Sequence, residues 1–127
     1  MSPPSLPLFV YGTLMRSGSQ AALVGDRPRQ PGWIHGTLFH LPAGYPAVVP
    51  GGDDPVHGEW LPPVPDAVLR ALDRYEGVPE GLYRRITLPV HTTTGVLPAW
   101  VWVMDDPRAR GGVVIPSGRW RPIRQRG

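Results

Sequence analysis

The sequence predicts an α+β fold built on a small, largely closed β-sheet, with one main helix and short flanking helical turns. The chain has 127 residues, the size of one domain with its own core. Its 18 prolines and 16 glycines recur at short intervals instead of gathering in one tract, as turns between many short strands require. Between these turns we count about six or seven strand-like segments and one strong helix, the pattern of an α+β domain.

The strands of the first half are bounded by glycine and proline turns. We expect extended segments at residues 8–11, 33–41, 44–49 and 56–61. Residues 17–24 are expected to form one or two helical turns, with Ser17 or Ser19 as the N-cap. Residues 51–55 combine two glycines, two aspartates and a proline, which predicts a turn.

The strongest helix signal runs from residue 65 to residue 76. Prolines precede it, and Gly77 followed by Pro79 ends it. Its apolar face consists of Val68, Leu69, Leu72 and Tyr75. After the helix we expect strands at 83–90 and 99–104, joined by a hairpin loop over 91–98, and a last extended piece at 113–115.

The composition excludes several classes of protein. There is no cysteine, which excludes disulfides, thiolate metal sites and cysteine nucleophiles. The four histidines lack metal-ligand spacing, so we expect no metal. No apolar stretch reaches transmembrane length and no targeting segment is recognisable, so we expect a cytoplasmic protein without membrane contact.

The charge is concentrated at the C-terminal end. Four of the 13 basic residues are Arg119, Arg121, Arg124 and Arg126, which leaves 13 − 4 = 9 basic residues against 10 acidic ones. We therefore expect a single domain over 1–120 and a basic tail over 121–127. Binding of RNA or another partner by this tail stays open as a less favoured alternative, and we expect no other nucleic-acid contact.

Residues 11–14 are a candidate binding loop. Tyr11, Gly12, Thr13 and Leu14 directly follow an apolar strand. A strand that ends at a glycine leaves main-chain N–H groups free, and these can hold a carboxylate or a developing oxyanion. The alternative is ordinary turn punctuation without a ligand.

Glu76 is the best general-base candidate. It lies four residues after Leu72 and seven after Leu69, so it projects from the apolar stripe of the helix. Both desolvation and its place in the last helical turn raise the pKa of a carboxyl, toward the value that a proton-transferring base at neutral pH needs. The alternative is an exposed, frayed helix end.

Six short motifs in order resemble the γ-glutamylcyclotransferase-like family, which includes the AIG2-like proteins. They are residues 11–14 (YGTL), 44–47 (GYPA), 56–59 (VHGE), 72–77 (LDRYEG), 83–85 (YRR) and 115–118 (IPSG) with Trp120. The resemblance covers about residues 8–120. It implies a small mixed β-barrel with a cavity at one end and a cofactor-free reaction. In that reaction the α-amine of a γ-glutamyl group attacks its own γ-carbonyl and releases 5-oxoproline and an amine.

The resemblance also implies roles for individual residues. Glu76 corresponds to the catalytic acid/base, and the loop of Tyr11, Gly12, Thr13 and Leu14 to the part that binds the γ-glutamyl group. Tyr45 and Tyr83 are expected to line the cavity, although a strand tyrosine is also commonly a packing residue. Arg84 or Arg85 could meet a substrate carboxylate, but an exposed strand arginine is the simpler interpretation. We expect Glu59 to be structural.

The sequence thus favours an enzyme acting on a γ-glutamyl amine or peptide. A non-catalytic member that keeps the cavity to bind a small molecule is the alternative. The leaving amine, the pathway and the oligomeric state are not predicted.

Overall fold

The computed structural model of the chain describes residues 5–15 and 20–121. The proposed caps Ser17 and Ser19 lie outside the described residues, as does the tail beyond Arg121. The helical turns expected near these serines begin later, as a 3-10 turn at Ala21–Val24. No helix in the described ranges is long and apolar enough to cross a membrane.

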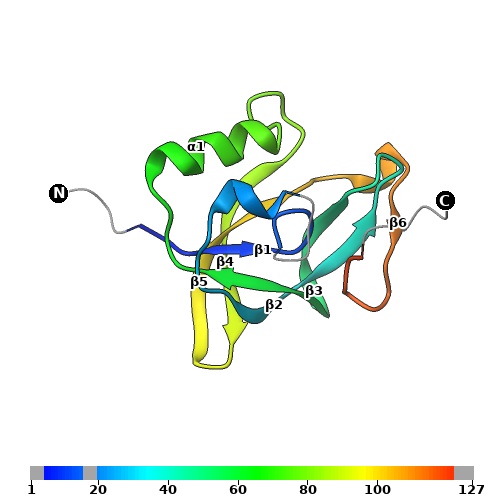
Figure 1. Cartoon of the computed structure of the whole chain (residues 1–127). Helices are drawn as coiled ribbons and strands as arrows, with labels where there is room; N and C mark the ends of the chain where they lie inside the picture. Colours follow the sequence, from blue (N-terminus) through cyan, green and yellow to red (C-terminus); the bar gives the residue numbers. More distant parts are fainter. Residues whose placement is uncertain (1–4, 16–19, 122–127) are drawn as a thin grey trace, which may run out of the picture.

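Five strands close into a barrel, and a sixth short strand extends it (Figure 1). The five are β1 (Leu8–Val10), β2 (Gln30–His40), β3 (Pro46–Leu61), β4 (Arg84–Thr92) and β5 (Gly95–Val103). They neighbour one another in the order β3-β1-β5-β4-β2, and pairing of β2 with β3 completes the ring. Strand β6 (Val113–Val114) pairs with the end of β2. Only the β1–β5 pair is parallel, so the described barrel is mixed and the predicted fold class is confirmed.

Two segments differ from the sequence prediction because strand pairing continues through them. The 51–55 turn is instead part of the long strand β3, where pairing with β2 jumps from Pro50 to Pro55 and leaves residues 51–54 as an exposed insertion. The hairpin expected at 91–98 is present but its loop is shorter than predicted, because β4 and β5 pair as far as Thr92 and Gly95. Proline and glycine here mark a bulge and a hairpin end, not long loops.

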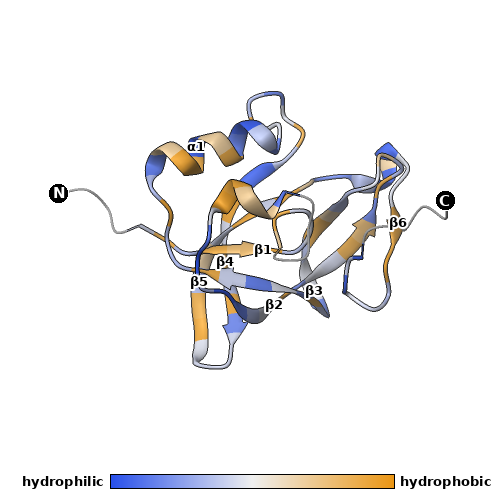
Figure 2. Cartoon of the chain, in the orientation of Figure 1, coloured by the Kyte–Doolittle hydropathy of each residue, from blue (hydrophilic) through white to orange (hydrophobic). Residues whose placement is uncertain are grey.

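The main helix α1 (Asp66–Tyr75) lies over one side of the barrel (Figure 1). It ends in a Schellman motif: Gly77 has a φ of 70°, and the N–H of Val78 donates to the carbonyl of Asp73 at 2.9 Å. Leu72 is its buried anchor. Hydrophilic residues gather at the C-terminal end of α1 (Figure 2), next to the turn that carries Glu76. A second 3-10 turn at Pro107–Arg110, which the sequence did not indicate, precedes β6.

Strand β1 is buried on both faces. Leu8 and Val10 pack in the cluster under α1, whereas Phe9 packs with Ile34, Val56 and Val101 inside the barrel. Burial on two faces explains why the run before Tyr11 is continuously apolar, without strand alternation. The end of β1 therefore brings residues 11–14 to the place where the two apolar clusters meet.

Candidate functional site

A pocket of about 200 Å³ opens at the C-terminal end of β1. Its wall contains every residue that the sequence predicted for the site: Tyr11, Gly12, Thr13, Leu14, Tyr45, Glu76 and Tyr83. The other lining residues are Phe9, Val10, Pro46, Tyr75, Leu82 and Trp102. The wall is mostly aromatic and apolar, with a few polar groups, as small-molecule sites usually are. Its volume suits a ligand smaller than a typical drug.

In residues 12–14 the main-chain carbonyl groups are hydrogen-bonded to described residues, whereas the main-chain N–H groups are not. The three carbonyl oxygens accept from the N–H of Met15 (3.0 Å), the N–H of Gln20 (2.8 Å) and the guanidinium of Arg29 (2.7 Å), in the order Gly12, Thr13, Leu14. None of the three N–H groups donates to another described residue. Free N–H groups in a pocket wall are donors for an anionic or developing negative oxygen.

Glycine is required at position 12 by packing. A Cβ there would lie 2.5 Å from Cγ of Pro46 and 2.9 Å from its Cδ. The loop can approach the start of β3 this closely only without a side chain. The Thr13 and Tyr75 hydroxyls are hydrogen-bonded at 2.8 Å, which connects the loop to the end of α1.

Glu76 follows α1 directly and its side chain lines the pocket from the helix side. It is partly buried, and its carboxylate accepts no hydrogen bond from another described residue. Burial first, and then the negative charge of Asp73, raise the pKa of Glu76 to about 7. The expectation of a partly buried carboxylate, and not a frayed exposed one, agrees with this geometry. Near neutral pH the group both accepts and releases a proton.

The four tyrosines of the chain all line this pocket. The hydroxyl of Tyr11 donates to the carbonyl of Trp102, and that of Tyr83 donates to the carbonyl of Pro46, each at 2.6 Å. Burial is the main cause that raises the pKa of both phenols well above the usual value. They therefore stay protonated near neutrality and serve as wall and scaffold, while Glu76 is the wall residue whose charge changes.

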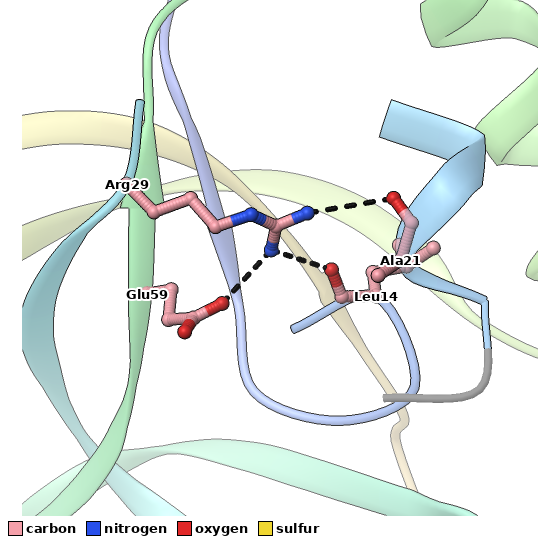
Figure 3. Close-up of polar contacts among 4 residues, drawn as sticks. All are labelled: Leu14, Ala21, Arg29 and Glu59. Carbon is pink, nitrogen blue, oxygen red and sulfur yellow. Dashed lines mark hydrogen bonds and ion pairs between the residues drawn. The ribbon is translucent and has the colours of Figure 1, made fainter. Parts of the chain in front are cut away.

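Other candidates lie outside the pocket wall. Arg85 pairs with Asp73 at 2.8 Å and Arg84 with Asp105 at 2.7 Å, so neither strand arginine reaches the site to bind a substrate carboxylate. Glu59 pairs with Arg29 at 2.8 Å. Figure 3 shows that this guanidinium also reaches the carbonyls of Leu14 and Ala21. Two of these pairs contact the pocket wall, since Arg29 donates to the carbonyl of Leu14 and Asp73 accepts from the indole of Trp102.

Sequence reasoning missed two polar members of the wall. Tyr75 was assigned to the apolar face of the helix, yet its ring is 42% exposed and its hydroxyl meets Thr13. Its place directly before Glu76 is the signal that could have identified it. Trp102 is not among the site residues that the sequence predicted, and its indole N–H donates to Asp73 at 2.9 Å. Within the described residues, no three His, Cys, Asp or Glu side chains are grouped to hold a metal ion.

The chain is similar to one protein family and to several solved structures. The profile of the family described as "Gamma-glutamyl cyclotransferase, AIG2-like" matches residues 8–122. YkqA from Bacillus subtilis is 25% identical with a TM-score of 0.74; the alignment covers 92% of this chain but 40% of YkqA. An AIG2-like protein from Mus musculus is 21% identical over 98% of this chain and 100% of its own, with a TM-score of 0.73. A protein described as a gamma-glutamyl cyclotransferase is 19% identical over 80% of this chain and 67% of its own, with a TM-score of 0.62. No curated protein matches this sequence.

Proposed function

This chain belongs to the gamma-glutamyl cyclotransferase, AIG2-like family, and we propose that it cleaves a γ-glutamyl amine or peptide by internal cyclisation. The observation that supports the proposal most strongly is that Glu76, with a pKa near 7, lines the same pocket as residues 12–14, whose N–H groups donate to no described residue. A base and an oxyanion-binding backbone are the two groups that this acyl transfer needs.

The reaction balances without a cofactor. Glu76 takes a proton from the α-ammonium, and the freed amine attacks the γ-carbonyl carbon of the same glutamyl group. The negative charge that develops on the carbonyl oxygen is stabilised by main-chain N–H groups of the loop. The bond from the carbonyl carbon to the departing nitrogen then breaks, and Glu76 returns the proton to that nitrogen. The attacking nitrogen gives up its second proton to solvent as it becomes the N–H of the lactam. The products are 5-oxoproline and the free amine.

The pocket supports the proposal by its size and its charge. A space of about 200 Å³ favours a folded glutamyl group, in which the amine and the carbonyl are brought together, over an extended one. Among the described residues that line the pocket, Glu76 is the single charged one, so it attracts the α-ammonium. In this arrangement the leaving amine extends toward the open side of the pocket.

The test is release of 5-oxoproline from a panel of γ-glutamyl amines, γ-glutamyl dipeptides and glutathione. We expect the wild type to act on at least one compound, with a rate that rises with pH through about 7 as Glu76 loses its proton. Glu76→Gln is expected to reduce kcat by about 100-fold or more, because general acid–base catalysis contributes about that much.

The matched control is Glu80→Gln, which changes an exposed glutamate in the turn that follows the helix. It should retain wild-type kcat. Activity that survives Glu76→Gln would contradict the role of Glu76. A wild type that binds 5-oxoproline or glutamate but turns over no compound of the panel would indicate the non-catalytic, ligand-binding alternative.

A further inference from the structure

Asp73 lies at the centre of a hydrogen-bonded cluster behind the pocket wall. Its Oδ1 accepts from Nε of Arg85 at 2.8 Å and from the indole N–H of Trp102 at 2.9 Å, and its Oδ2 accepts from Nη2 of Arg85 at 3.1 Å. The side chains of Asp73 and Arg85 are only 18% and 22% exposed. A two-pronged arginine–carboxylate contact with a third donor fixes the orientation of the carboxylate. One residue of α1 is thus held by β4 and by β5.

The same cluster reaches both halves of the candidate site. Trp102 lines the pocket, and its carbonyl accepts the hydroxyl of Tyr11, the first residue of the binding loop. Asp73 is one helical turn before Glu76, and its own carbonyl accepts the N–H of Val78 in the turn that ends the helix. The turn that follows Glu76 is therefore hydrogen-bonded to the main chain of Asp73.

We propose that Asp73 is a positioning residue for Glu76: held by Arg85 and Trp102, it fixes the end of α1 against the barrel and sets the charge that the Glu76 carboxylate experiences. This inference rests on the proposed function for its catalytic meaning. The effect of Asp73 on the protonation of Glu76 does not depend on that function, because this protonation can be measured without substrate.

The other titratable groups around Glu76 do not change the direction in which Asp73 shifts its pKa. Among the described residues, the titratable groups around it are the carboxylate of Asp73 and the phenols of Tyr11, Tyr75 and Tyr83, which stay neutral near pH 7. The phenol of Tyr45 lines the same pocket. Asp73 is the charged member of this set, and its negative charge favours the protonated form of Glu76. Removing that charge lowers the pKa of Glu76, and removing the cation beside Asp73 raises it.

The chain offers a matched control one residue away on β4. Arg84 forms the same kind of pair with Asp105, with Nε–Oδ1 and Nη2–Oδ1 distances of 3.0 and 2.7 Å. This pair is 54% and 71% exposed, and neither residue lines the pocket. Variants of the two pairs change the same residue types, and both arginines lie on β4, but of these two pairs only Asp73–Arg85 is connected to Glu76.

The experiment is a ¹³C NMR titration of the side-chain carboxyls of the three glutamates in the chain, with the Glu76 signal assigned from the Glu76→Gln spectrum. We expect Asp73→Asn, in which an amide oxygen can still accept from the indole of Trp102, to lower the Glu76 midpoint by about half a pH unit or more. Arg85→Gln should raise it. Asp105→Asn and Arg84→Gln should leave it unchanged.

Activity gives an independent readout on the same variants. If the wild type releases 5-oxoproline, Asp73→Asn should move its pH–rate profile to lower pH by the same amount and reduce kcat by about tenfold, because the base is less well placed.

The inference is overturned if the titration midpoint of Glu76 is the same as in the wild type in both Asp73→Asn and Arg85→Gln, or if it moves equally in the two control variants. A silent wild type with the predicted NMR shifts would instead reject the proposed function and keep the electrostatic role of Asp73. If Asp73→Asn fails to fold, the opposite shift in Arg85→Gln decides.

Discussion

At the scale of single residues, the contact between Gly12 and Pro46 is the tightest constraint on the binding loop. Any side chain at position 12 meets the Pro46 ring, because the first carbon alone would be 2.5 Å from it. We expect Gly12→Ala to lower the free energy of unfolding by about 1–3 kcal/mol, the usual cost of overpacking, and to weaken binding of 5-oxoproline. Urea unfolding and calorimetric titration measure the two effects.

The control for this prediction is a double-mutant cycle. Pro46→Ala removes the ring atoms that oppose the new methyl group while keeping the carbonyl that accepts from Tyr83. The cost of Gly12→Ala should therefore shrink in the Pro46→Ala background. Equal costs in both backgrounds would mean that the glycine is needed for something other than this contact.

At the scale of elements, Arg29 ties three segments together. Its guanidinium is 6% exposed and contacts Glu59 on β3, the carbonyl of Leu14 in the binding loop and the carbonyl of Ala21 in the first 3-10 turn (Figure 3). Loss of this side chain leaves a buried carbonyl without a partner. We expect Arg29→Met to lower the free energy of unfolding by about 2–4 kcal/mol, measured by urea unfolding.

Arg84→Met provides the comparison, because its ion pair with Asp105 is exposed to solvent. Exposed pairs are typically worth less than about 1 kcal/mol, so the two methionine variants should differ clearly. Similar losses in both would indicate that the barrel does not depend on the Arg29 contacts.

The sequence predicted the bounds of an element well where residues within that segment determine them, and poorly where pairing with a distant strand determines them. The helix was placed within a residue at each end, because prolines, a glycine and an apolar stripe all act within one segment. The hairpin ends at Thr92 and Gly95 and the insertion at 51–54 depend on which strand lies opposite, so they require the barrel itself. The same holds for the site. The seven residues predicted for it line one pocket, but the partners Arg85 and Trp102 of Asp73 come from strands that no local pattern joins to the helix.

At the scale of the whole molecule, the raised pKa of Glu76 makes folding stability depend on pH. The pKa of a glutamate in an unfolded chain is about 4.3, and in the folded protein that of Glu76 is about 7. Below the lower value Glu76 is protonated in both states and costs nothing. Between the two values the unfolded chain gives up the proton and the folded one keeps it, so stability falls as pH rises, by on the order of 3 kcal/mol in total once pH exceeds 7.

Glu76→Gln removes this dependence and should therefore stabilise the protein while inactivating it. We expect the variant and the wild type to have similar free energies of unfolding at pH 4, and the variant to be more stable by about 2–3 kcal/mol at pH 8. Urea unfolding at both pH values measures the difference, in which the contributions of all other titrating groups cancel. Glu80→Gln, at an exposed position, should show no such gain. A Glu76→Gln variant with the same difference from wild type at both pH values would mean that the carboxylate is not held at a cost in the fold. A pocket that holds a carboxyl group titrating near neutrality gives up folding stability above that pH, and this difference measures how much.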